Sequence, residues 1–187
     1  MFETIKNNPA TIFDMRGYPH GTAWEIAPRL TEKKDVGAAL FSRPILEAAK
    51  LGDGDLTETR YTFLQKLPKA KGDVYKGKVV MLINEDAVSQ SEHTCMFFEA
   101  ATDVTFIGTP TTGANGDVTT MVLPGNLVVS FSGHDVRHAD GRQLQRLGIQ
   151  PHVVSAPTIR GIVEKRDEVL ETAVKYLQEK LTKLSTR

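Results

Sequence analysis

The feature of this sequence that most constrains its fold is a change of hydrophobic period within residues 78–101, KVVMLINEDAVSQSEHTCMFFEAA. The run Val79–Ile83 is continuously apolar and rich in β-branched residues, which is typical of a strand buried on both faces. Asn84, Glu85 and Asp86 interrupt it. From Ser89 onward the apolar residues recur at helical spacing. The pattern therefore predicts a buried strand, a turn and a helix, with a serine at the sheet's carboxyl edge, beside a helix N-terminus.

Two interpretations of Ser89 follow from this position. With Glu92 three residues later, Ser89 fits a capping box, in which each side chain bonds the other's backbone N–H. Alternatively, Ser89 is a nucleophile, since some hydrolases place one on such a strand-to-helix turn. The local pattern alone favours the cap, because capping serines are much commoner. A base and an oxyanion hole elsewhere in the chain would favour the nucleophile.

The rest of the chain alternates strands with helices. We expect strands at Ala10–Met15, Val36–Phe41, Glu58–Lys66 and Val104–Gly108, and a hairpin of Asp117–Leu123 with Leu127–Ser132. We expect helices at Thr22–Leu30, capped by Thr22, and at Val163–Leu184, with Glu171 and Lys175 paired on its outer side. We expect loops at Ala48–Asp55, Pro68–Lys78 and Gly133–Pro151. This order predicts an α/β fold with a largely parallel central sheet.

Composition excludes several classes of function. The chain has 23 basic and 23 acidic residues, and this balance argues against nucleic acid or an anionic membrane as the main partner. Its one cysteine, Cys95, cannot form an internal disulfide and falls in an apolar helical stretch, which favours a packed thiol. No apolar run is long enough to insert in a bilayer. We therefore expect no metal, no cofactor and no membrane insertion.

Four stretches in order resemble the tail-specific, or C-terminal-processing, serine peptidases. They are FDMRGYPHG at 13–21, NEDAVSQSE at 84–92, IGTPTTGANGDV at 107–118 and HADGRQLQRLGIQPHV at 138–153. In that family they correspond to the oxyanion loop, the nucleophile turn, a Gly-Lys-Gly loop and a Gly-Arg to Gly-Ile-x-Pro segment. Together they reverse the preference for a simple cap at Ser89.

The resemblance implies a Clp-protease/crotonase-like fold of stacked β-β-α units, with residues 1–187 as a single peptidase core domain. It implies a serine endopeptidase that cleaves protein or peptide substrates through an acyl-enzyme on Ser89. The backbone amides of Gly17 and Gln90 would form the oxyanion hole. It also suggests a periplasmic or other extracytoplasmic location.

One position departs from the family pattern. The family's lysine-dyad members use the lysine of the Gly-Lys-Gly loop as general base, whereas this loop reads Gly113-Ala114-Asn115-Gly116. Because alanine cannot accept a proton, we expect the base to come from outside this chain, from an upstream region that often also carries a PDZ-like module. The alternative is a non-catalytic peptide-binding domain on the same fold. Acyl-thioester chemistry of the crotonase type is disfavoured by the serine turn.

Several other polar residues are candidates for the site. His20, His138 and Arg142 are candidate substrate-binding residues, although each also fits a structural role in its loop. His93 lies one helical turn after Ser89 and fits a helix-surface residue better than a substitute base. His134 and His138 could each pair with a carboxylate such as Asp135 or Asp140. Arg137, Arg142 and Arg146 could recognise a peptide carboxylate or pin their loop to backbone carbonyls.

Overall fold

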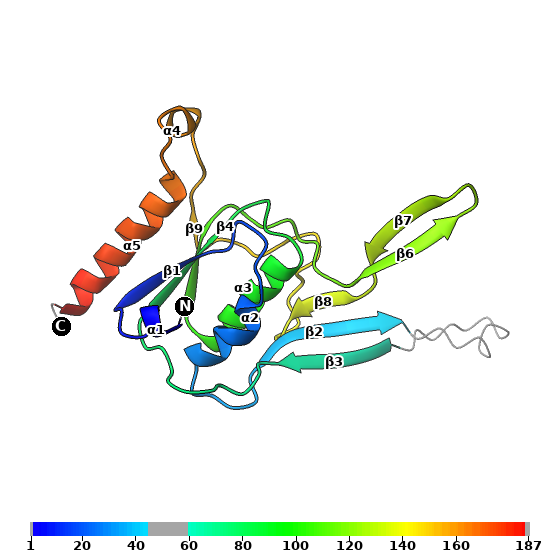
Figure 1. The fold of residues 1–187 in the computed structure, drawn as a ribbon, viewed down its shortest axis with the longest axis horizontal. Helices are drawn as coiled ribbons and strands as arrows, with labels where there is room; N and C mark the ends of the chain where they lie inside the picture. The colour runs from blue at the N-terminus through cyan, green and yellow to red at the C-terminus, as the bar shows by residue number, and fades with distance from the viewer. Residues whose placement is uncertain (1, 45–59, 186–187) are drawn as a thin grey trace.

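The computed structural model describes residues 2–44 and 60–185, and its centre is a four-stranded parallel sheet (Figure 1). The sheet has the strand order β1-β4-β5-β9. Its strands are β1 (Ala10–Asp14), β4 (Lys78–Ile83), β5 (Val104–Gly108) and β9 (Val153–Val154). β1 and β4 pair in parallel from Ala10 with Lys78 to Asp14 with Leu82, so their carboxyl ends reach the same edge. The loop after β1 and the turn after β4 therefore lie side by side.

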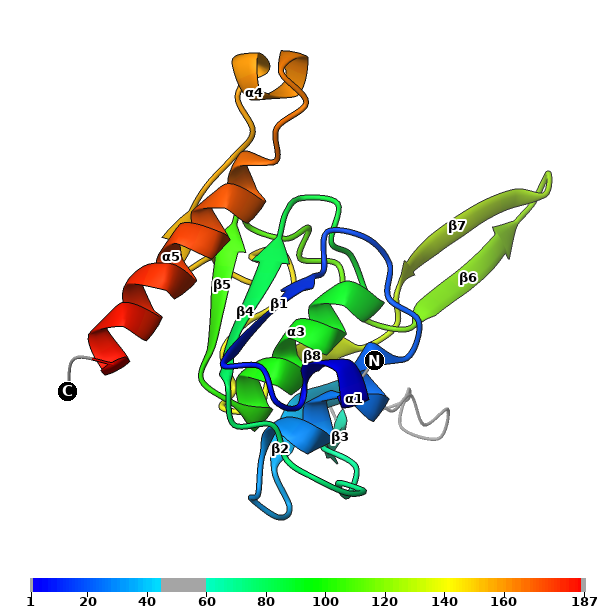
Figure 2. The same cartoon turned by 60° about the vertical axis from the view of Figure 1, so that its left-hand side comes forward.

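Strand β4 is buried on both faces, as its apolar run predicts. Val79, Met81 and Ile83 join a large core cluster with helix α3 (Gln90–Ala101), whereas Val80 and Leu82 join a smaller cluster with helix α5 (Glu168–Ser185). The two helices thus cover opposite faces of the sheet (Figure 2). Cys95 is fully buried, as expected, and burial raises the pKa of its thiol well above the ordinary value.

A second, antiparallel sheet packs against the other side of α3. Its strand order is β3-β2-β8, from β2 (Gly37–Pro44), β3 (Arg60–Lys66) and β8 (Asp135–His138). The expectation of a largely parallel sheet is therefore correct for the central sheet alone. β8 lies inside the segment Gly133–Pro151, which the sequence predicts to be irregular. Three of the four residues of β8 are polar, and only Val136 is apolar. Pairing with β2 makes it a strand.

Two helix predictions are wrong in detail. α2 (Thr22–Glu25) begins after Gly21, whose backbone is left-handed, and no side chain caps it. The turn continues as the 3-10 helix η1 (Ala27–Leu30), because Pro28 cannot donate the next helical hydrogen bond. The expected helix Val163–Leu184 is confirmed as α5 from Glu168 onward, whereas Val163 is the last residue of a separate short helix, α4 (Ile159–Val163). A short helix α1 (Phe2–Ile5) lies at the start of the described residues.

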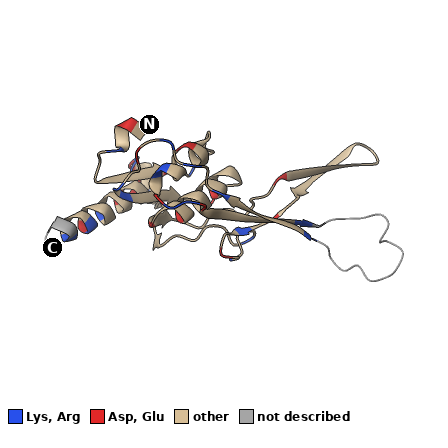
Figure 3. Cartoon of the chain, turned by 90° about the horizontal axis from the view of Figure 1, so that it is seen from below, with Lys and Arg blue, Asp and Glu red and all other residues tan. Residues whose placement is uncertain are grey.

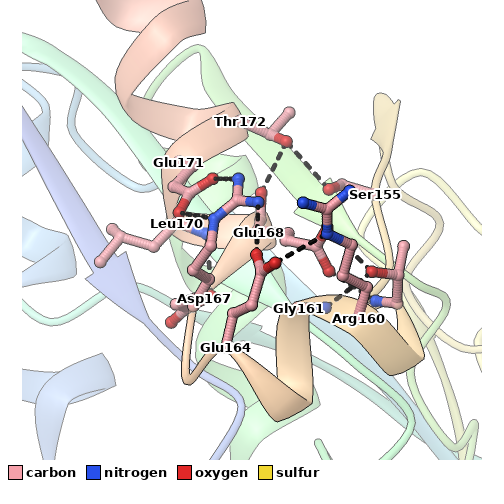
Figure 4. Close-up of polar contacts among 11 residues, drawn as sticks. Ser155, Arg160, Gly161, Glu164, Asp167, Glu168, Leu170, Glu171 and Thr172 are labelled. Atoms are coloured by element: carbon pink, nitrogen blue, oxygen red, sulfur yellow. Dashed lines mark hydrogen bonds and ion pairs between the residues drawn. The ribbon is translucent and has the colours of Figure 1, made fainter.

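The α4–α5 junction is held by polar contacts (Figure 4). Glu168 accepts hydrogen bonds from the backbone N–H and the hydroxyl of Thr158. Glu171 pairs with Arg166, five residues earlier, rather than with Lys175 as the spacing predicts. The N-terminal end of α5 is therefore fixed by residues that precede it.

The predicted hairpin is present as β6 (Val118–Leu123) and β7 (Leu127–Ser132). It extends away from the two sheets (Figures 1 and 2). The expected strands at Ala10–Met15, Val36–Phe41 and Val104–Gly108 are also confirmed to within a few residues. The expected loop Ala48–Asp55, and Glu58 and Thr59 of the predicted third strand, lie outside the described residues.

Candidate active site

Ser89 immediately precedes α3 and has an unusual backbone conformation. Its φ of 53° and ψ of −108° are rare for a residue with a side chain, and its hydroxyl makes no capping hydrogen bond. Ser89 instead lines a cleft of about 310 Å³. The capping-box interpretation is therefore wrong, since the helix gains no cap from this serine. Backbone strain of this kind is concentrated at functional sites.

Glu92, the other half of the expected capping box, has a different role. Its carboxylate is fully buried and accepts hydrogen bonds from the Thr111 hydroxyl at 2.6 Å, the Gly113 N–H at 2.5 Å and the Ala114 N–H at 3.0 Å. These three donors belong to the loop that corresponds to the family's Gly-Lys-Gly loop. Glu92 therefore fastens this loop to the first turn of α3. The spacing of Ser89 and Glu92 predicts a capping box, and no sequence pattern points to these distant partners.

The loop that carries Gly17 lies against the same helix. The Met15 N–H donates to the carbonyl of Leu82, and the Ser91 hydroxyl donates to the carbonyl of Gly17 at 2.8 Å. Tyr18 and Gln90, next to Gly17 and Ser89 respectively, both line the cleft. The loop and the helix start are thus brought together, as the resemblance implies. The oxyanion-hole role of the Gly17 and Gln90 amides stays a prediction.

Arg16 ties this loop to the opposite side of the sheet. Its guanidinium bonds the carboxylates of Asp14 and of Asp167, the residue before α5, at 2.6–2.9 Å. These hydrogen bonds hold the pKa of both carboxyl groups below the ordinary value. Asp167 also accepts from the Leu170 N–H and so caps α5. Sequence reasoning did not identify this bridge.

The cleft itself has one wall rich in aromatic side chains. It is lined by Tyr18, Trp24, Phe41, Gln65, Ser89, Gln90, His93, Asn115, Gly116, Asp117 and Val118. Tyr18 is 59% exposed and Trp24 is 40% exposed, so part of each ring is available to a ligand. The one carboxylate in the lining is that of Asp117. The cleft therefore combines aromatic rings with polar side chains around Ser89.

His93 is not the helix-surface residue that its spacing suggests. It is 7% exposed and packs against the rings of Trp24, Phe41 and Phe97. Burial lowers the pKa of His93 to about 4, and the charge of Asp117 opposes this shift only in part. Its Nδ1 lies 3.4 Å from Nδ2 of Asn115. His93 is therefore a neutral imidazole in the wall of the cleft at pH 7.

His134 and His138 each lie beside a carboxylate, although not beside Asp135 or Asp140. The Nδ1 of His134 is 3.0 Å from Oδ2 of Asp117, without the alignment of a hydrogen bond. The ring of His134 meets that of Phe41 edge to face. His138 is bonded to Glu99 at 2.6 Å. Of these two histidine–carboxylate pairs, only the His134–Asp117 pair includes a residue that lines the cleft, namely Asp117.

Two of the three candidate substrate-binding residues, His138 and Arg142, are brought together on the carboxylate of Glu99. His20 is exposed, and neither it nor His138 nor Arg142 lines the cleft. Arg142 bonds the carboxylates of Glu99 and Asp140, and Arg137 bonds Asp135, so these two arginines bind carboxylates and not backbone carbonyls. Glu99 lies nine residues beyond Gln90, about 14 Å along the helix. The part of these residues in substrate binding stays a prediction.

The described ranges 2–44 and 60–185 contain neither a membrane-spanning helix nor a metal-binding cluster. No helix there is long and apolar enough to cross a membrane. In the same ranges, no group of three or more His, Cys, Asp or Glu side chains is arranged to hold a metal ion.

Comparison with known proteins identifies the family. Residues 30–155, more than half of the chain, match the description Peptidase family S41. The chain belongs to peptidase family S41. A curated protein of Chlamydia pneumoniae is 31% identical to this S41 chain over 150 residues, which are 78% of this chain and 24% of that protein. The resemblance to C-terminal-processing peptidases is thus confirmed at the level of the family.

Solved structures share the fold of this S41 chain at low sequence identity. One from Parabacteroides merdae has a TM-score of 0.76 at 23% identity and covers 94% of this chain and 54% of its own. Mature CPAF complexed with lactacystin has a TM-score of 0.67 at 17% identity, covering 99% and 45%. The tricorn protease has a TM-score of 0.56 at 18% identity, covering 97% and 16%. The chain therefore has the S41 peptidase fold and spans about half or less of each of these proteins.

Proposed function

We propose that this chain is the core of a serine peptidase in which Ser89 attacks the peptide carbonyl. One observation supports this most: the Ser89 hydroxyl makes no capping bond and lines a cleft, on a backbone turn that costs strain. Family S41 membership is consistent with this chemistry. The expected substrate is a protein or peptide that extends along the aromatic wall.

The proposed reaction forms and breaks bonds in two stages. The Ser89 Oγ adds to the carbonyl carbon and loses its proton to a base, and the amine leaves with a proton to give an acyl-enzyme. Water then adds to the ester and releases the acid. The amides of Gly17 and Gln90 would donate to the oxyanion in both stages, and each such donor contributes about 3 kcal/mol to transition-state stabilisation.

The base is the missing part of this mechanism. Ala114 stands where the family resemblance places a lysine, and the Ala114 N–H donates to Glu92, so the loop backbone is fixed while its side chain is exposed. We propose that the base comes from a region upstream of these 187 residues. The alternative is that the domain binds peptides without cleaving them, which the alanine at position 114 favours. An extracytoplasmic location is proposed from the family resemblance alone.

A fluorophosphonate probe tests the nucleophile. The longer parent polypeptide is incubated with the probe, and the adduct is located by mass spectrometry of the digested protein. We expect labelling at Ser89, and none in the Ser89→Ala variant. An unlabelled parent that still binds peptide with unchanged affinity after Ser89→Ala would identify the non-catalytic domain instead.

A second experiment restores a base in this chain. Ala114→Lys places an amine on the loop that Glu92 holds, and Ala114→Met is the matched control of similar length without the amine. We expect Ala114→Lys to raise the rate of probe labelling at Ser89 at least tenfold, and more at pH 9 than at pH 7. Equal rates for the two variants would show that the lysine does not reach the serine hydroxyl.

A further inference from the structure

The hairpin β6–β7 has two chemically different faces. Residues opposite one another in its register share a face, and residues alternate between faces along each strand. One face carries Val118, Thr120, Val122, Val128, Ser130 and Ser132, and Thr120 and Ser130 hydroxyls meet across it at 3.3 Å. The other, here called the apolar face, carries Thr119, Met121, Leu123, Leu127, Val129 and Phe131.

The apolar face is open to solvent. Five of its six residues are large and apolar, and they are 39–64% exposed, from Val129 to Leu127. In the region of the chain that the structure describes, each hairpin strand pairs only with the other. An isolated two-stranded hairpin is marginally stable in water. An exposed apolar face on such a hairpin indicates a surface that another polypeptide covers. The hairpin extends well beyond the sheets, which do not supply that cover (Figures 1 and 2).

The absence of charged residues from the hairpin limits which partners could cover the apolar face. Residues 118–133 include no Asp, Glu, Lys or Arg, and the hairpin is tan along its length in Figure 3. Natural edge strands are usually protected from self-association by charged side chains, above all by lysine. No charged side chain on residues 118–133 would oppose the approach of an identical hairpin. A partner that is recognised by its charge has nothing to bind on this surface.

The area of the face fits a second copy. The five apolar side chains expose on the order of 500 Å² per copy, so two facing copies would remove about 1,000 Å² from water, the lower limit for a specific protein interface. A two-fold axis lets each side chain meet the same type of face on the partner. We propose that two copies of this chain associate by packing the apolar faces of their β6–β7 hairpins against each other.

The proposed dimer leaves the cleft accessible. Val118 lines the cleft and belongs to the opposite face of the hairpin, so the two functions use different faces. An interface of this size is at the weak end of specific association, and we expect a dissociation constant in the micromolar range. The dimer is thus independent of whether Ser89 is catalytic.

Sedimentation velocity over about 1–300 μM tests the dimer. Met121→Lys puts a charge on the apolar face, and Val122→Lys puts the same charge on the opposite face at the next residue. We expect wild type and Val122→Lys to dimerise with similar dissociation constants and Met121→Lys to stay monomeric up to at least tenfold higher concentration. Circular dichroism of each variant checks that it is folded.

A mixture provides the complementary test. Met121→Lys and Val129→Glu introduce opposite charges on the apolar face, and each should be monomeric alone. Because the two charges would face each other across the axis, we expect the mixture to regain dimers. A wild-type chain that is monomeric throughout, or a dimer that Met121→Lys leaves unchanged, would overturn the proposal. A longer parent that stays monomeric while the 187-residue chain dimerises would also overturn it, and would assign the face to the parent's own chain.

Discussion

At the scale of single residues, Glu92 shows how one buried charge organises the site. Three donors from the 111–114 loop converge on its carboxylate, which has no exposure to solvent. Without them an ionised carboxylate in this position would be strongly destabilising. The position of the loop beside Ser89 therefore depends on this side chain.

Substitution of Glu92 should be costly. Glu92→Gln replaces one acceptor oxygen by an NH₂ group that faces donors, and we expect the free energy of unfolding to fall by about 2–4 kcal/mol. Urea denaturation measures this. Glu85→Gln is the matched control, because Glu85 accepts from Thr109 of the same loop but is exposed. A similar midpoint for both variants would mean that the buried network contributes little.

His93 should make stability depend on pH. The folded-state pKa of about 4 lies below the unfolded value near 6.5, so the unfolded chain binds the proton more tightly. The stability is complete above pH 6.5 and is lost as pH falls toward 4, by roughly 2–3 kcal/mol from this group. His93→Gln should abolish that slope in urea titrations at pH 7, 6 and 5. His20→Gln, on an exposed loop, should retain it.

Residue roles were predicted unevenly from sequence. Ser89, Gly17 and Gln90 were predicted as site residues because they lie in motifs with a fixed local order; Ser89 and Gln90 line the cleft, and the catalytic roles of all three stay predictions. His93 and Glu92 were misassigned, because helical spacing reveals neither the rings nor the loop amides that surround them in the fold. Asp117 and Asn115 enter the cleft through loop geometry that no spacing rule gives.

At the scale of elements, Arg16 links the loop after β1 to the start of α5. Its two carboxylate partners have lowered pKa values, so the stability they contribute is present above about pH 4 and is lost as pH falls through their folded-state values. We expect Arg16→Gln to reduce the free energy of unfolding by about 1–2 kcal/mol at pH 7. Thermal unfolding at pH 7 and pH 3 should show the difference from wild type shrink in acid. The exposed Arg160→Gln should change little at either pH.

Strands with continuous apolar runs were predicted well. A strand that forms only because a neighbouring strand pairs with it was not predicted. β4 and β5 are recognisable because alternate side chains fill two cores. β8 is a strand because β2 lies beside it, and its own residues are mostly polar. The break between α4 and α5 lies at Lys165, which has a positive φ of 56°, beside the hydrogen bond from the Arg166 N–H to the Gly161 carbonyl.

At the scale of the whole molecule, we expect the β6–β7 hairpin to contribute little to the stability of the two core clusters, which share strands β4 and β5. The Gly133 N–H donates to the Asp117 carbonyl at 2.6 Å, so the hairpin's base is already closed and residues 118–132 can be replaced by an Asn-Gly turn. At low protein concentration we expect the free energy of unfolding to change by less than about 1 kcal/mol. Leu177→Ala, in the α5 cluster, should cost about 2–4 kcal/mol in the same urea titration. A large loss from the hairpin replacement would contradict this expectation.

The extensive burial of α3 also bears on how the molecule can move. Nine of its twelve residues are buried, so we expect the backbone amides of this helix, which directly follows Ser89, to exchange slowly. The loop after β1 contacts α3 through the hydrogen bond from the Ser91 hydroxyl to the Gly17 carbonyl. If the site adjusts to a bound peptide, we therefore expect the loop after β1 to move and the Ser89 hydroxyl to stay in place. Motions on the microsecond-to-millisecond timescale, observable by relaxation dispersion, should be concentrated in Arg16–Gly21 and absent from the first turn of the helix.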